Sequence, residues 1–445
     1  MKASAFKYTI LSAVATMVML VLVLMPFHAF LTVWLASHFG HYTALRLWKE
    51  LILVAAGLGV VYLMLTDHKI RTHTLSRRLV WLIAAYAVLQ VAIGLIVWHN
   101  GDVTTKALLY GWLVDLRFLV FFLICWAVAL RTARLQANWF NLLIFPALAV
   151  ALIAVLQATV LPHDVLRHFG YGPATIEPLE TINHNQHYLR VMSTLRGANP
   201  LGAYLILPIT ALVIGLCKNR RSWRLWLGLV LCTLALYFSH SRSAFLGALL
   251  AAGIVLALNV RSKLGKQLLA AGAGVVVVLA VILSLALHNN ADFQNVVLHT
   301  QTNSSSPQSS NDGHVAALKS GLHDIRHRPF GAGPGTAGPA SIYNDGKARI
   351  AEDYFIQLGQ EVGIVGMLLF IIINAGIGYL LWLRRQSPLA MCLLASLIGL
   401  TLVNCLLHAW ADDTVAYVWW GLAGMAMATL PITETKTTRG KKQAH

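Results

Sequence analysis

The chain has 445 residues, of which 58% are hydrophobic and only 11% are charged, and its mean hydropathy is +0.67. This composition excludes an ordinary water-soluble domain and indicates a polytopic membrane protein, because the polar residues are too few to cover the apolar part in water. The formal net charge of +17 is compatible with nucleic-acid binding or with membrane topology, and its distribution along the chain decides between the two.

Long apolar segments recur along the whole chain. Twelve of them, some short, can cross ~30 Å of hydrocarbon as helices. They lie at about residues 8–36, 51–66, 79–98, 107–130, 139–161, 199–217, 225–240, 243–260, 268–287, 361–383, 389–410 and 414–431. The sequence therefore predicts an all-α polytopic membrane bundle of about twelve transmembrane helices, with a large, partly helical loop outside the membrane.

Basic residues are concentrated in one set of connecting segments. If the N-terminus lies in the cytoplasm, these segments lie on the cytoplasmic side as well. These segments carry 21 of the 34 Lys and Arg residues but only 2 of the 17 Asp and Glu residues. They are the N-terminus, residues 67–78, 131–138, 218–224, 261–267 and 384–388, and the C-terminal tail. Because basic loops stay on the cytoplasmic side, both termini are expected in the cytoplasm. The surplus charge then reflects topology, and nucleic acid is not an expected partner.

Two connections on the opposite side are long, at residues 162–198 and 288–360. Long loops on a rigid scaffold often carry function, so we expect the functional site there. They divide the chain into residues 1–287, with nine helices and the first long loop; residues 288–360, a loop that caps the site; and residues 361–445, with three helices and a basic cytoplasmic tail.

The second long loop has a pattern of its own. Val315, Leu318, Leu322 and Ile325 recur at helical spacing, which predicts an amphipathic helix on the membrane surface that ends before Pro329. The GAGPG run that follows lacks the Gly-Lys-Ser/Thr sequence of a nucleotide-binding loop, and we interpret it as a structural turn.

Three arginines are expected at one depth near the outer membrane interface. Arg190 and Arg196 precede the sixth predicted helix, and Arg242 lies in the tight outer turn SHSRSAF between the seventh and eighth. A guanidinium matches phosphate oxygens with two parallel hydrogen bonds, so the three arginines could together hold a phosphate or diphosphate. The alternative is that they bind lipid headgroups or nearby carboxylates.

Two charged residues, Asp115 and Arg117, fall inside the fourth predicted helix. A charge at this depth costs roughly 2.5–3.5 kcal/mol on insertion scales, so both side chains must face protein or water. Residues two positions apart point to different sides of a helix, so each needs a partner on another helix. A structural ion pair and a polar substrate site fit this pattern equally well.

The remaining candidates are carboxylates and imidazoles. Glu352 and Asp353 come just before the tenth predicted helix, at the depth expected for the arginines. A carboxylate there can act as general base on a sugar hydroxyl, an effect worth ~10²–10⁴ in rate, or it can pair with one of the arginines. His184 and His187 have a spacing that a metal could use, but no further ligand accompanies them, so no metal site is expected.

Four stretches of the chain together resemble a known family. They are LYGWLVDLRFLVFFL, RVMSTLRGANPLGAYL, SHSRSAFLGALL and the loop that ends in AEDYFIQLGQEVGIVG, within about residues 107–383. In this order, and with a large outer loop, they are similar to the O-antigen ligase and O-antigen polymerase superfamily of bacterial envelope glycan enzymes. Ligases of this family show His, then Asn, Ser or Gln, then nine residues and GxxG. Here Glu352 and Asp353 stand in the same frame before Gly363 and Gly366, with Glu in place of His.

The resemblance implies an inverting glycosyl transfer, without metal or cofactor, at the outer face of the bacterial cytoplasmic (inner) membrane. The implied donor is a glycan linked to undecaprenyl diphosphate, and the implied acceptor is a glycan or a lipid core. Carried over by position, Arg190 or Arg196 would hold the donor diphosphate together with Arg242, and Glu352 or His323 would act as the base. Glu in place of His leaves both ligation and polymerisation open, and the sugar and the oligomeric state are open as well.

Two other classes of protein fit parts of this pattern. A transporter or lipid flippase would line its path with Asp115, Arg117 and the three outer arginines, but carriers usually bind near the middle of the bilayer, whereas these polar residues gather mainly at one face. A non-catalytic member of the family would scaffold an envelope assembly. The position of the largest polar cavity distinguishes a transferase from a carrier. The cavity of a transferase opens only outward, whereas that of a carrier opens alternately to both sides.

Overall fold

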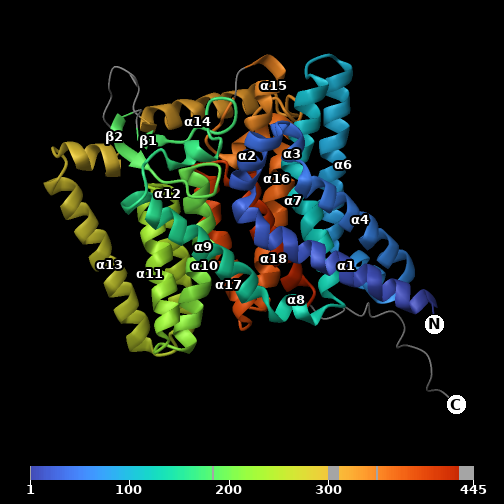
Figure 1. Cartoon of the computed structure of the whole chain (residues 1–445), viewed down its shortest axis with the longest axis horizontal. Coiled ribbons are helices and arrows are strands. Elements are labelled where there is room, and N and C mark those ends of the chain that lie inside the picture. The colour runs from blue at the N-terminus through green and yellow to red at the C-terminus, as the bar shows by residue number, and fades with distance from the viewer. Residues whose placement is uncertain (1, 183–184, 299–309, 347–348, 430–445) are drawn as a thin grey trace.

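The computed structural model describes residues 2–182, 185–298, 310–346 and 349–429 (Figure 1). Most of these residues are helical, and the only strands among them form one small hairpin. The all-α membrane class predicted from the composition is therefore confirmed.

Each predicted apolar segment overlaps one or two of the helices. The long helices are α1 (Lys2–Leu24), α2 (His28–Phe39), α4 (Trp48–Thr66), α6 (Arg78–His99), α7 (Thr105–Ala129), α9 (Trp139–Thr159), α10 (Ala198–Lys218), α11 (Trp223–Phe238), α12 (Arg242–Asn259), α13 (Lys263–Ala286), α16 (Tyr354–Leu383), α17 (Pro388–Asn404) and α18 (Asp413–Met427). Within the described residues, eight helical segments are long and apolar enough to cross a membrane, and α11 and α17 are shorter apolar helices. The predicted count of twelve spans is thus not confirmed.

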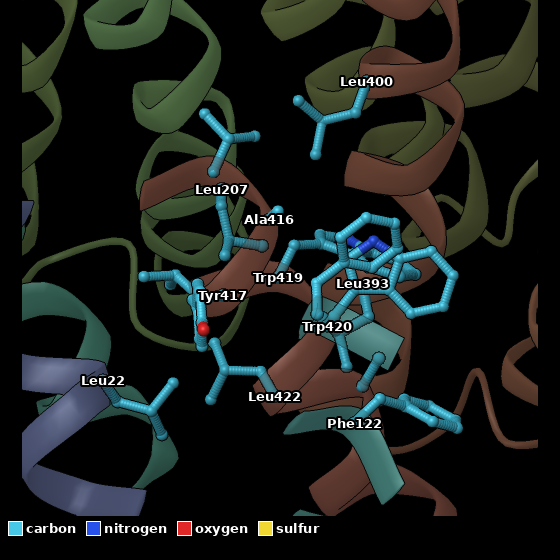
Figure 2. Packing of buried hydrophobic residues seen from close by; sticks show 14 of the residues in the cluster. Leu22, Phe122, Leu207, Leu393, Leu400, Ala416, Tyr417, Trp419, Trp420 and Leu422 are labelled. Carbon is cyan, nitrogen blue, oxygen red and sulfur yellow. The ribbon is translucent and has the colours of Figure 1, made fainter. Parts of the chain in front are cut away.

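Helix α18 lies at the centre of the bundle. Residues 414–427 of this helix are all buried, and it packs against α1, α7, α10 and α17. A helix that is apolar on every side needs such a setting. The rings of Trp419 and Trp420 lie 5.3 and 5.7 Å from the ring of Trp410. Figure 2 shows Trp419, Trp420 and Phe122 in this aromatic core.

The two long connections fold over one end of the bundle, which we call the loop end (Figure 1). The first forms strands β1 (Glu180–Ile182) and β2 (Asn185–Arg190), which pair antiparallel with Glu180 opposite Arg190. This hairpin was not predicted from the sequence. The second forms α14 (Ser310–His327) and α15 (Ile342–Asp345), and α14 confirms the predicted helix before Pro329. The other short helices are α3 (Tyr42–Leu45), α5 (His68–Leu75) and α8 (Ala133–Ala137).

The glycine turn of the long loop is docked on a break in α16. Gly363 has φ +70°, and the helix is interrupted there. The amide of Ile364 donates to the carbonyl oxygen of Pro329 at 2.9 Å, and the amide of Gly335 donates to Oε1 of Glu361 at 2.8 Å. A Cβ on Gly363 would lie 2.3 Å from the Pro329 oxygen, so only glycine fits this crossing. The geometry agrees with the interpretation of GAGPG as a structural turn.

Candidate functional site

A cavity of about 480 Å³ lies at the loop end, and we call it the arginine cavity. Three of the candidate residues line it: Arg190, Arg242 and Glu352. The other lining residues are Asn199, His240, Ser243, Leu246, Asn311, His314, Val315, Leu318, Cys405, Leu406 and Leu407. Helix α14, which packs against α16, contributes both polar and apolar side chains to this lining. The cavity therefore combines two guanidinium groups, one carboxylate and an apolar wall.

Arg190 enters the cavity from the end of β2. Its Nε donates to the carbonyl oxygen of Ser239 at 3.0 Å, and its Nη2 donates to Oδ1 of Asn199 at 2.5 Å. The nearest carboxylate is that of Glu180, at 3.8 Å from Nη1. Burial lowers the pKa of Arg190, and Glu180 opposes this effect. One distant carboxylate neutralises the guanidinium only in part, so the cavity favours an anion at this position.

Arg242 is the first residue of α12 and fastens the long loop to the bundle. Its Nη1 donates to the carbonyl oxygen of Leu298 at 2.7 Å, and its Nη2 donates to Oδ1 of Asn311 at 2.9 Å. Among the described residues no carboxylate lies within ion-pair distance of it, so no carboxylate neutralises its charge. Burial, and secondarily Arg190, lower the pKa of the neighbouring His240, which favours the neutral imidazole. The positive charge in this part of the cavity thus comes from the two arginines.

The backbone of Glu352 is strained. Its φ is +58°, a left-handed conformation that costs a non-glycine residue ~1–2 kcal/mol. Such strain is concentrated at functional sites. The Glu352 carboxylate lies 3.3 Å from Nδ1 of His314 on α14. Asp353 caps α16 instead, because its carboxylate accepts the amide of Ile356 at 2.9 Å, and burial raises the pKa of Asp353.

Two other candidates lie elsewhere. Arg196 is outside the arginine cavity, with its Nε 3.7 Å from Oδ2 of Asp412, and it lines two neighbouring cavities. His323 is exposed on α14, where its ring stacks on His327 at 4.0 Å, and it does not line the arginine cavity. His184 falls outside the described residues. Among those described, no group of three or more His, Cys, Asp or Glu side chains could hold a metal ion.

Asp115 and Arg117 both have partners on other helices. Arg117 pairs with Asp413 of α18 and lies 3.6 Å from Glu50 of α4. Asp115 accepts a hydrogen bond from the hydroxyl of Tyr354 at 3.3 Å. Each side chain is therefore engaged inside the protein, which favours the structural role over a translocation path lined by free charges.

Sequence reasoning missed several residues of the arginine cavity. His240 lies two residues before Arg242, so its position in the sequence could have indicated that it belongs to the site. No sequence pattern in the first turns of α14 indicates that Asn311 and His314 line the cavity. Asn199 is likewise inconspicuous in the sequence, although it holds Arg190. These side chains reach the site only because the long loop folds back over the bundle.

The fold defines a helical membrane protein, and a cavity at one end of its bundle combines two arginines and a carboxylate with an apolar wall. Residues 227–371, about a third of the chain, match the family model of O-antigen ligase. This match confirms the predicted resemblance to the O-antigen ligase and polymerase superfamily. It covers Arg242, His314 and Glu352, whereas Arg190 lies before it. No curated protein matches the chain.

Proposed function

We propose that this protein is an integral-membrane inverting glycosyltransferase. It transfers a glycan from undecaprenyl diphosphate to an acceptor glycan or lipid core. The family match supports glycan transfer in general. The observation that carries the specific proposal is that Arg190, Arg242 and Glu352 line one cavity with an apolar wall. In this proposal the loop end faces the periplasm, and both termini lie on the cytoplasmic side of the bacterial inner membrane.

The donor is amphipathic, and the cavity matches its two halves. Leu246, Leu318 and Leu406 offer an apolar surface to the polyprenyl chain. Arg190 and Arg242 offer planar donor groups to the diphosphate at the boundary between chain and sugar. Both arginines are already held by carbonyl and amide oxygens, so the protein positions them before the donor binds.

The reaction follows from the positions of these charges. The Glu352 carboxylate accepts the proton of the acceptor hydroxyl while the hydroxyl oxygen forms a bond to the anomeric carbon. The bond from this carbon to the diphosphate oxygen breaks, and its electron pair leaves with the diphosphate. Attack opposite the leaving group inverts the configuration. Arg190 and Arg242 stabilise the charge that grows on the diphosphate, a role that metal ions fill in other transferases. We therefore propose a reaction without metal or cofactor.

The two carboxylates at the start of α16 have different tasks in this proposal. Glu352 is the base, and Asp353 is a helix cap that holds the backbone of its neighbour in place. His323 has no direct part, because it is exposed outside the cavity. His314 of α14 orients the Glu352 carboxylate through the contact between them.

A transfer assay with purified protein tests the proposal. The donor is an undecaprenyl-diphosphate-linked glycan in detergent, and the variants are Arg242→Ala and Glu352→Gln. Each variant should lower the transfer rate by about 10²-fold or more. Arg167→Ala is the matched control, because this arginine is exposed in the first long loop and, among the described residues, forms an ion pair only with Asp164, at 3.7 Å. Near-normal transfer by both site variants would remove the mechanism, and activity without partner proteins excludes a scaffold.

Ligation and polymerisation are separated by the products of a knockout strain. A polymerase leaves short glycans when it is lost. A ligase leaves full-length polymer on the carrier lipid. Complementation with the Glu352→Gln variant should reproduce the knockout pattern in either case.

A further inference from the structure

A second polar cavity of about 530 Å³ lies at the loop end, and we call it the tyrosine cavity. Its lining includes Tyr42, Arg46, Tyr110, Arg196 and Tyr343. A smaller cavity of about 130 Å³ lies between it and the arginine cavity. This small cavity shares Asn199 with the arginine cavity and shares Arg196 and Asp412 with the tyrosine cavity. The three cavities therefore adjoin one another.

One wall of the tyrosine cavity is a buried ionic cluster in which charges of both signs are paired. Asp413 pairs with Arg117 and lies 3.2 Å from Nζ of Lys49 and 3.3 Å from Nε2 of His28. Lys49 also lies 3.0 Å from Glu50. Because these charges satisfy one another, the cluster gives the cavity a fixed wall and offers little net charge to a ligand.

Arg46 is different from this cluster. Its Nη2 donates to the hydroxyl of Tyr110 at 2.7 Å, and its guanidinium lies 5.7 Å from the ring of Tyr42. Among the described residues no carboxylate lies within ion-pair distance of it. A guanidinium held only by neutral groups keeps its charge for a ligand anion.

The tyrosines supply a second kind of contact. The rings of Tyr110 and Tyr343 meet edge to face with centroids 5.2 Å apart, and Nζ of Lys106 lies 4.3 Å from the centroid of Tyr343. Tyrosine combines an apolar ring face with a hydroxyl that donates and accepts hydrogen bonds. Aromatic surface with a few fixed polar groups is the usual lining of a small-molecule site, and it suits the apolar face and hydroxyls of a sugar ring.

We propose that the tyrosine cavity is the acceptor subsite and takes a sugar that carries a phosphate or a carboxylate. This inference rests on the proposed function. The sugar packs against Tyr110 and Tyr343, and Arg46 binds its anionic group. In an inverting displacement the acceptor approaches opposite the leaving diphosphate. The small cavity adjoins both the arginine cavity and the tyrosine cavity, and in this proposal the acceptor extends through it to Glu352.

Kinetics with three acceptors test the inference. They are a phosphorylated core oligosaccharide, the same oligosaccharide after phosphatase treatment, and a uronic-acid-containing oligosaccharide. Arg46→Gln keeps a donor for Tyr110 and loses the charge, so KM for the preferred anionic acceptor should rise about tenfold or more. Tyr343→Ala should raise KM for all three acceptors. In both variants KM for the undecaprenyl-diphosphate-linked donor should stay within about twofold of the wild-type value. In the control Arg167→Ala, KM for the donor and for all three acceptors should stay within the same range.

The outcomes separate this inference from the proposed function. Unchanged acceptor KM in Arg46→Gln and Tyr343→Ala, with transfer lost in Glu352→Gln, leaves the function standing and overturns the inference. A rise in donor KM instead assigns the cavity to the donor glycan and overturns it too. Native mass spectrometry gives a third contrary outcome. If a phospholipid stays bound to the wild type and is lost in Arg46→Gln while acceptor KM is unchanged, the cavity binds lipid and the inference is overturned. If the wild type transfers nothing, the proposed function fails. Saturation-transfer NMR of the phosphorylated oligosaccharide with wild type and Arg46→Gln then decides the inference.

Discussion

Replacing Arg117 by Met is expected to destabilise the bundle strongly. The Arg117 side chain is only 3% exposed, pairs with Asp413 and lies 3.6 Å from Glu50. Its Nη2 also donates to the carbonyl oxygen of Ala411 at 3.1 Å. Methionine is similarly long but carries no charge, so the loss is mainly electrostatic.

The surroundings of Asp413 set the size of the effect. Removal of one member of a buried ion pair costs ~3–5 kcal/mol, because the other charge stays buried. Here Lys49 and His28 remain 3.2 and 3.3 Å from Asp413, so we expect the lower limit, about 3 kcal/mol. Asp413→Asn removes the same contact from the other side. The double variant with Arg117→Met should therefore lose less than the sum of the single losses, by roughly 2 kcal/mol.

Chemical unfolding in detergent, followed by tryptophan fluorescence, measures these differences. The probe is suitable because Trp410, Trp419 and Trp420 are all buried in the core. Arg167→Met is the matched control and should change the free energy of unfolding by less than about 0.5 kcal/mol. An Arg117→Met variant as stable as the wild type, or a double variant with strictly additive losses, would refute the reasoning.

Three further changes test the loop end. Gly363→Val places a Cβ 2.3 Å from the Pro329 oxygen, so the glycine turn should detach from α16 and limited proteolysis should cleave the long loop faster. Asp353→Ala removes the cap of α16 and should lower the free energy of unfolding by about 1 kcal/mol. Burial, and then Arg196, lower the pKa of His408 from its usual 6.5 to about 4. His408 therefore binds a proton at a higher pH in the unfolded chain than in the folded chain. The free energy of unfolding should fall as pH drops from 6.5 towards 4. His408→Asn should remove this part of the pH dependence of Tm.

Each of these three predictions has a control variant and an outcome that would contradict it. Gly253→Ala is the control for proteolysis, since a Cβ there meets nothing within 4 Å, and wild-type resistance in Gly363→Val would contradict the docking. Wild-type stability of Asp353→Ala would mean that the cap contributes nothing. His323→Asn, at an exposed histidine, is the matched control for the histidine substitution. An unchanged profile in His408→Asn would show that the titrating group is another one.

The sequence alone determined the membrane class and the positions of the helices. A segment in lipid has to satisfy its backbone hydrogen bonds internally, so a long apolar run becomes a helix whatever its neighbours are. The helix before Pro329 was equally predictable, because its apolar residues recur at helical spacing. The turn at Arg242 lay between two such helices and followed from their ends. The hairpin was missed because its short strands, within a polar connection, carry no comparable pattern.

Only the tertiary structure decided which candidates share a cavity. Arg190 and Arg196 are six residues apart and looked equivalent, yet β2 directs Arg190 to the arginine cavity while Arg196 faces Asp412. Glu352 and Asp353 are adjacent, and the left-handed backbone of Glu352 sends their carboxylates to different places. These outcomes depend on contacts between distant segments, such as the one from Arg242 to Asn311 across 69 residues. The bilayer dictates each helix locally, whereas such contacts form only when the loops fold back over the assembled bundle.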